Sequence, residues 1–155
     1  VILLLAGLAG VLYYFYRSPL ILVKNVAEVH HKEGGISGLK VILHIRNRGK
    51  EKIQHIEVTD RIPNMTYIEK DVTIGTLHPA KVLQHSHRTT LAKWDIENID
   101  SGDERVISYR LRAKLPILGG LMLPPAVGRC MVDGKQVVTY SNRLAVEKEL
   151  PKNVE

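Results

Sequence analysis

The fold of this chain is decided by the stretch Leu39-Lys40-Val41-Ile42-Leu43-His44-Ile45-Arg46. Its odd-numbered positions are all apolar, and three of its four even-numbered positions carry a basic or histidine side chain. A period of two residues is typical of a strand with one face in the core and the other in solvent. The following Asn47-Arg48-Gly49-Lys50 is a turn signal, so we expect the chain to reverse direction there.

Similar short runs recur on both sides of this stretch, each bounded by turn residues. Leu20 to Val29 reads as a first strand that ends before the Glu33-Gly34-Gly35 loop. Ile56 and Val58 belong to a later strand, which we expect Asp60-Arg61-Ile62-Pro63 to stop. Residues 64–80 lack a steady period and predict a crossing loop with one helical turn and a short strand. Further strands are expected over residues 82–85, 91–96, 107–113, 126–132 and 136–140, with another loop between Pro116 and Pro125.

The last two of these strands flank Asp133-Gly134, which favours a tight type I′ hairpin because both central residues take a positive φ. Short strands spaced by turns predict an all-β fold, an antiparallel β-sandwich over residues 19–150 with a tail at 151–155. Trp94 is expected in the core, and Tyr109 either packs there or closes a corner with its hydroxyl. Cys130 is expected to be a small buried residue.

The first sixteen residues carry no charge, and they end in aromatic rings followed by a cation. Aromatic side chains settle at the lipid headgroups and a basic one reaches the phosphates, so residues 1–18 predict a transmembrane or assembly helix. The run is shorter than the roughly 20 residues of a full span, and a signal-peptide remnant or a buried core helix stays an alternative. The predicted membrane anchor consists of Val1, Leu5, Leu8, Leu12, Tyr13, Tyr14, Phe15, Tyr16 and Arg17.

Composition narrows the classes of function. The formal charge is +6, but lysines and arginines are spread along the chain beside acids, without a dense basic block, so no nucleic acid is expected as a partner. The single cysteine excludes an internal disulfide. There is no Gly-x-Ser-x-Gly elbow and no phosphate-binding glycine loop followed by Lys-Ser or Lys-Thr. We therefore expect no enzyme, no cofactor and no small-molecule substrate.

Two weak site signals remain. His85 and His87 would share one face of a strand, with His78 nearby, which is a common metal-ligand geometry. No acidic or thiol ligand stands at a fixed spacing beside them, so a solvated polar face is the preferred interpretation and no metal site is predicted. Asn64-Met65-Thr66 is a formal glycosylation acceptor in an expected loop, accessible if the domain faces outward.

Several segments together resemble a known family. They are Leu39 to Pro63 with its Asn47-Arg48-Gly49 turn, Trp94-Asp95-Ile96, Ser101-Gly102-Asp103-Glu104-Arg105, Ile107 to Arg110, Leu123 to Ala126 and Tyr140-Ser141-Asn142. In this order, over residues 38–147, they resemble the immunoglobulin-like conserved-repeat domains of archaeal and bacterial surface proteins. These domains are related to the cell-adhesion-related domain found in bacteria.

The resemblance implies an immunoglobulin-like sandwich without an active site, in an archaeal-type cell envelope. The expected function is non-enzymatic protein binding or scaffolding by a single-pass membrane domain, with the lipid bilayer and other envelope proteins as partners, including copies of itself. The alternative is a pilin-like filament subunit whose N-terminal helices bundle beneath an outer wall of sandwiches. Arg17 and Lys24 flank the apolar segment, and the positive-inside tendency would place them in the cytoplasm. The resemblance favours the outside, and we follow it.

Overall fold

The computed structural model describes residues 6–10, 18–69, 81–84 and 90–147. The described residues form an all-β fold in which every pair of neighbouring strands is antiparallel. The strands are β1 (Leu20–Lys32), β2 (Gly35–Asn47), β3 (Ile53–Ile62), β4 (Thr66–Ile68), β5 (Lys81–Gln84), β6 (Thr90–Ile99), β7 (Glu104–Ile117), β8 (Leu121–Leu123), β9 (Val127–Val132), β10 (Lys135–Tyr140) and β11 (Leu144–Val146). The predicted fold class is therefore confirmed at the level of an all-β, antiparallel chain.

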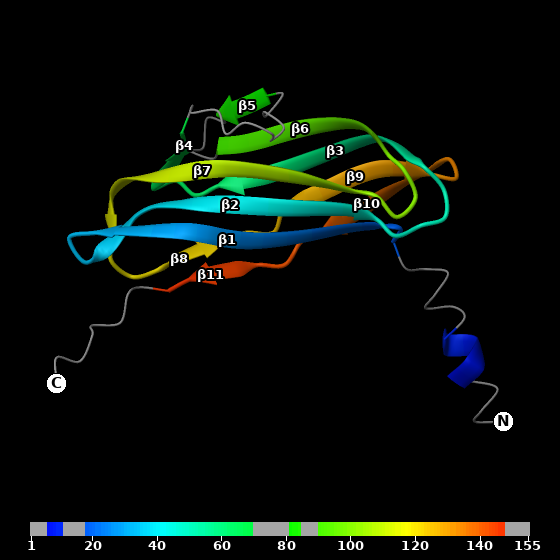
Figure 1. The fold of residues 1–155 in the computed structure, drawn as a ribbon, viewed down its shortest axis with the longest axis horizontal. Helices are drawn as coiled ribbons and strands as arrows, with labels where there is room; N and C mark the ends of the chain where they lie inside the picture. Colours follow the sequence, from blue (N-terminus) through cyan, green and yellow to red (C-terminus); the bar gives the residue numbers. More distant parts are fainter. Residues whose placement is uncertain (1–5, 11–17, 70–80, 85–89, 148–155) are drawn as a thin grey trace.

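These strands are arranged in two larger sheets and one small sheet. The first sheet has the order β1-β2-β7-β4, the second the order β10-β9-β3-β6-β5, and β11 pairs with β8. The longer strands run along the long axis of the molecule (Figure 1). The chain changes between the two larger sheets after β2, β3, β4 and β6, so residues far apart in sequence meet across the core.

One hydrophobic core lies between the two larger sheets. The stretch over residues 39–46 lies in β2 and turns its odd-numbered residues into this core, as expected. Trp94 of β6 and Tyr109 of β7 contact each other, with ring centroids 5.4 Å apart, although they belong to different sheets. The expected core position of Trp94 and the burial of Cys130 are both confirmed. Burial of this apolar surface is the main force that holds the sheets together.

The predicted hairpin at Asp133-Gly134 is also present. Val132 pairs with Lys135, and the φ angles of Asp133 and Gly134 are 50° and 74°. Both values lie in the left-handed region that a type I′ turn requires at its two central positions. The local signal alone was therefore sufficient to place this turn.

The structure refines one sequence expectation and corrects two. β3 ends within the predicted stop segment Asp60 to Pro63, but it runs through Asp60 to Ile62 and buries the Asp60 carboxylate. Lys24 is not a cation flanking a membrane segment, because its side chain is buried in the core. The expected loop between Pro116 and Pro125 contains β8, which pairs with β11 more than twenty residues later. In the described part of the segment 64–80, Asn64 and Met65 form a turn and β4 supplies the expected short strand.

At the N-terminus, residues 6–10 are helical and exposed, and they include Leu8. The other predicted anchor residues lie outside the described residues. Among the residues that the structure describes, no helix combines the length and the apolar character needed to cross a bilayer.

Candidate functional site

The outer face of the second sheet is built by the register of its strands. Tyr140 of β10 lies opposite Val127 of β9, and Val127 lies opposite Thr59 of β3. In the next row, Val138 lies opposite Arg129, and Arg129 lies opposite Glu57. Because side chains alternate along a strand, the residues of both rows point away from the core. Across β10, β9 and β3, the face therefore carries an uncharged row beside a row that contains Arg129 and Glu57.

The charged row is held by ion pairs around Glu57. Lys93 Nζ of β6 lies 2.6 Å from one carboxylate oxygen of Glu57, and Arg129 Nη1 lies 3.8 Å from the other. The hydrogen bond to Glu57 raises the pKa of Lys93 above its ordinary value. These pairs are exposed to solvent and add little stability, but they hold the long side chains of β3, β6 and β9 in defined positions.

A groove of about 500 Å³ runs across this face. Pro124 and Pro125 precede β9 and form part of its wall together with Leu91 and Tyr140. Proline has a fixed φ and no side-chain freedom to lose, so this wall is stiff. Tyr140 is 66% exposed although it is a large aromatic residue. We call this hollow the outer-face groove.

An exposed apolar shoulder adjoins the groove. Met131 of β9 and Val138 and Tyr140 of β10 are all exposed, and the pairing of the two strands brings them onto the same face. Protein interfaces are enriched in aromatic residues, methionine and arginine relative to the rest of the surface. The shoulder and the groove, with Arg129 between them, have this composition.

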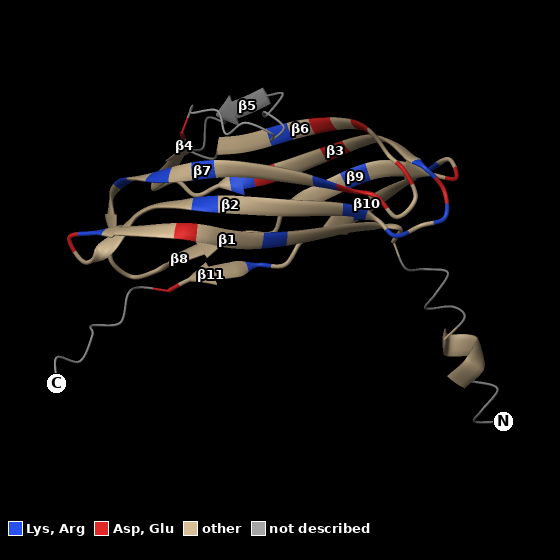
Figure 2. Cartoon of the chain, in the orientation of Figure 1, with Lys and Arg blue, Asp and Glu red and all other residues tan. Residues whose placement is uncertain are grey.

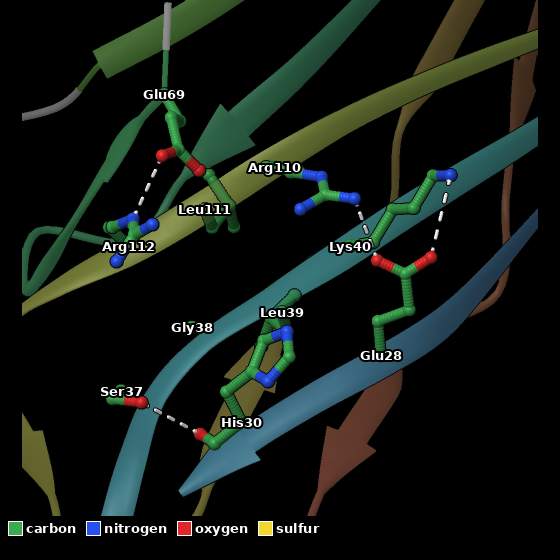
Figure 3. Close-up of a pocket in the computed structure, with 10 residues that line it drawn as sticks. All are labelled: Glu28, His30, Ser37, Gly38, Leu39, Lys40, Glu69, Arg110, Leu111 and Arg112. Atoms are coloured by element: carbon green, nitrogen blue, oxygen red, sulfur yellow. Dashed lines mark hydrogen bonds and ion pairs between the residues drawn. The ribbon is translucent and has the colours of Figure 1, made fainter. Parts of the chain in front are cut away.

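A second hollow lies on the first sheet and has a different character. It holds about 200 Å³ and opens where β1 bulges away from β2, between Ala27 and His30. Glu28 takes a φ of 50° at this bulge, and Gly38, opposite His30, contributes no side chain to fill the space. Figure 3 shows the side chains that surround the hollow.

The charges of this second hollow are paired with one another. Glu28 lies between Arg110 and Lys40, with distances of 2.9 Å and 3.8 Å to their nitrogens, and Arg112 Nε contacts Glu69 at 3.0 Å (Figure 3). An incoming anion would have to displace a carboxylate, and an incoming cation would have to displace an arginine or lysine. The hollow is therefore a less suitable binding site than the outer-face groove. Elsewhere, charges of both signs are spread over the sheets and turns (Figure 2).

The candidate residues from the sequence fall in different places. His78, His85 and His87 lie outside the described residues. Within the described residues, no group of three histidine, cysteine, aspartate or glutamate side chains is placed to hold a metal ion. Asn64 is exposed in the turn before β4, where an acceptor asparagine would be accessible.

The sequence interpretation missed a buried polar cluster between the sheets. Lys24 of β1 and Asp60 of β3 are 1% and 0% exposed, and Tyr109 of β7 donates a hydrogen bond to Asp60. The sequence signal that could have revealed this cluster is the alternation of inward and outward positions along each strand. Asp60 stands in step with Ile56, Val58 and Ile62, and Lys24 stands in step with Leu20 and Leu22, so each occupies an inward position.

Comparison with known proteins finds a likeness in fold and gives no evidence on function. No protein-family model matches the chain, and no curated protein matches it. Among solved structures, two of the GH20 exo-β-N-acetylglucosaminidase from Vibrio harveyi match 88% of this chain at 12% identity, with TM-scores of 0.52 and 0.53. This chain spans only 19% of the length of that enzyme. A yeast delta-COP mu-homology domain is similar at 16% identity, with a TM-score of 0.39 that supports no inference. The likeness to the Vibrio enzyme concerns the fold alone.

Proposed function

We propose that this chain is a non-enzymatic, membrane-anchored domain of the cell envelope that binds another envelope protein. The exposed shoulder formed by Met131, Val138 and Tyr140 is the observation that carries the proposal. Three large, mainly apolar side chains exposed on one face of the same strand pair favour burial against a partner. The stiff groove beside them would receive a side chain of that partner.

The geometry of the outer face suits a protein partner. Tyrosine and arginine are common energetic centres of interfaces, because each offers a large contact area together with hydrogen bonding. Here Tyr140 supplies the aromatic anchor, and Arg129 lies in the adjoining row of the sheet. The ion pairs of Glu57 with Lys93 and Arg129 would form a polar rim. A partner that presents an apolar side chain to the groove and leaves these ion pairs intact would complement this arrangement.

The finer fold assignment and the location belong to the same proposal. We infer an immunoglobulin-like sandwich of the conserved-repeat type, supported by the resemblance over residues 38–147 and by the two larger sheets that share one core. The domain would stand outside the cell, held at the bilayer by the uncharged N-terminal residues. Asn64 would then face the compartment in which glycosylation occurs.

A photocrosslinking experiment on intact cell envelopes tests the binding surface. A photoreactive amino acid at Val138 should give a discrete adduct with one partner, and the same residue at Asn25, exposed on β1 of the other sheet, should not. Tyr140→Glu should abolish the adduct without unfolding the domain, because the side chain is mostly in solvent. Equal labelling at the two positions would contradict a specific surface.

The membrane anchor is tested separately on vesicles of the full chain. We expect the domain to stay with the membrane after a carbonate wash and to be digested only by protease added on the outer side. Complete release by the wash would count against the anchor and would leave the binding surface untouched.

A further inference from the structure

Two reactive side chains meet between the sheets. Lys24 Nζ lies 2.6 Å from Asp60 Oδ1 and 2.5 Å from the carbonyl oxygen of Pro124. The Tyr109 hydroxyl donates a hydrogen bond of 2.5 Å to the other carboxyl oxygen, Asp60 Oδ2. The amine and the carboxyl group are thus held in contact from both sides, by groups that belong to β1, β3, β7 and the segment before β9.

The surroundings of this pair are dry. Lys24 and Asp60 are 1% and 0% exposed, and Trp94 packs on Tyr109 at the same level of the core. Burial deprives each ion of its favourable hydration. Desolvation lowers the pKa of Lys24 and raises the pKa of Asp60, the coulombic attraction of the partner opposing both shifts. Transfer of one proton from Lys24 to Asp60 leaves a neutral amine facing a neutral carboxylic acid.

We propose that Lys24 and Asp60 condense into an intramolecular amide bond that joins β1 to β3. The lone pair of Lys24 Nζ attacks Asp60 Cγ, forming the nitrogen–carbon bond and a tetrahedral intermediate. One proton moves from the nitrogen to the hydroxyl oxygen of the former carboxyl group. The carbon–oxygen bond then breaks and one water molecule leaves. No oxidant, reductant or other reactant is required.

The neighbours of the pair have defined roles in this step. A carbon–oxygen bond is about 1.2 Å long, so Nζ lies less than about 4 Å from Cγ, close to the distance of a reactive approach. The Tyr109 hydroxyl points at the oxygen on which negative charge develops, as a donor of an oxyanion hole does. The Pro124 carbonyl accepts a hydrogen bond from Nζ and so orients the amine.

The amide bond between Lys24 and Asp60 would lie on β1, a strand that would carry tension applied to the two ends of the domain. β1 begins near one end of the long axis, and β11 ends toward the other half of the molecule (Figure 1). Tension between the two ends of the domain therefore acts along β1, which pairs with β2 alone in its sheet. An amide between β1 and β3 ties this edge strand to the central strand of the opposite sheet.

Intact-mass spectrometry of the denatured full chain provides the test. We expect the wild-type chain to be lighter than its sequence mass by one water molecule. Trypsin should release a branched peptide in which residues 18–32 and residues 53–61 are joined, since modified Lys24 is no longer cleaved. Mapping is needed because a succinimide at Asp133-Gly134 also loses water, but it would leave those two peptides separate.

Matched variants separate the bond from an ordinary ion pair. Lys24→Arg keeps the positive charge but should show the full sequence mass. Asp60→Asn should end at the same final mass as the wild type, because it forms the same amide by releasing ammonia. Tyr109→Phe should slow the loss of water at least tenfold after refolding from denaturant. A wild-type chain of full sequence mass, or one whose branched peptide is absent, overturns the proposal whatever the variants do.

Discussion

Asn47 ties together three segments at one end of the molecule, and its replacement by alanine should be strongly destabilising. Its side chain is fully buried, at 0% exposure, at the end of β2. Nδ2 donates to the carbonyl oxygens of Glu51 and Ile99, at 2.7 Å and 3.0 Å, and Oδ1 accepts from the backbone N–H of Gly49 at 2.9 Å. The side chain thus closes the turn after β2 and attaches it to the end of β6.

The size of the effect follows from these three bonds. A typical intramolecular hydrogen bond contributes about 0.5–1.5 kcal/mol, and a buried group left without a partner costs about 1–3 kcal/mol. Asn47→Ala removes all three bonds and leaves the Ile99 carbonyl in a buried setting without this donor. We therefore expect the free energy of unfolding to fall by about 3 kcal/mol, from a total of about 5–15 kcal/mol for a domain of ordinary stability.

Equilibrium unfolding in urea measures this change. With an m-value of about 2 kcal/mol per molar urea, the midpoint should fall by about 1.5 M while m stays constant. Asn25→Ala is the matched control, because the Asn25 side chain is exposed on β1, and it should change the free energy by less than about 0.5 kcal/mol. Equal midpoints for the two variants would refute the reasoning that buried hydrogen bonds hold this end together.

Three further outcomes are expected. Gly35→Ala should lower the free energy of unfolding in urea by about 1–3 kcal/mol, because a Cβ there would lie 2.9 Å from the backbone nitrogen of Ile117. Gly119→Ala is the control and should be neutral, because a Cβ at that position has no atom within 4 Å. Ser141→Ala should cost about 1–3 kcal/mol, since the serine hydroxyl accepts the buried N–H of Ala126; a loss below about 0.5 kcal/mol would contradict this. Burial raises the pKa of the Cys130 thiol above its ordinary value of 9.0. The stability gained by burying the neutral thiol is therefore complete below about pH 9 and is lost as pH rises through the folded-state pKa. Wild-type unfolding should therefore become easier as pH rises above about 9, and Cys130→Ala should flatten the curve.

Local patterns in the sequence were sufficient for most strands and for one turn. The alternation over residues 39–46 and the Asp133-Gly134 hairpin depend on neighbours within a few residues, and both are found as expected. The pairing of β8 with β11 depends on residues more than twenty positions apart, and local turn residues made that region look like a plain loop. Contacts of this kind are not encoded in a short window.

The buried cluster was missed for a different physical reason. Charge is a strong sign of solvent exposure, because burying an ion is costly, and it led to Lys24 being placed at a membrane flank and Asp60 at a strand end. The alternation of apolar residues contradicted both placements, because it put each residue at an inward position. A charged residue at an inward position can be buried when a residue of opposite charge lies at an inward position of another strand. Lys24 and Asp60 are such partners, and neither could be buried alone.

The edges of the sheets bear on how this domain meets a partner. A free strand edge invites pairing with another chain, but the edges of β1 and β10 make contacts with other segments at specific residues. The Asn142 side chain accepts the N–H of Lys24 at 2.8 Å and donates to its carbonyl at 2.9 Å, in place of a neighbouring strand. Ser18 and Thr139 also join the start of β1 to β10 through a hydroxyl contact of 2.7 Å. Strand addition on this side would have to break these contacts first, whereas a partner docking on Tyr140 and the outer-face groove would break none. The face of the second sheet is therefore a better surface for recognition than this edge.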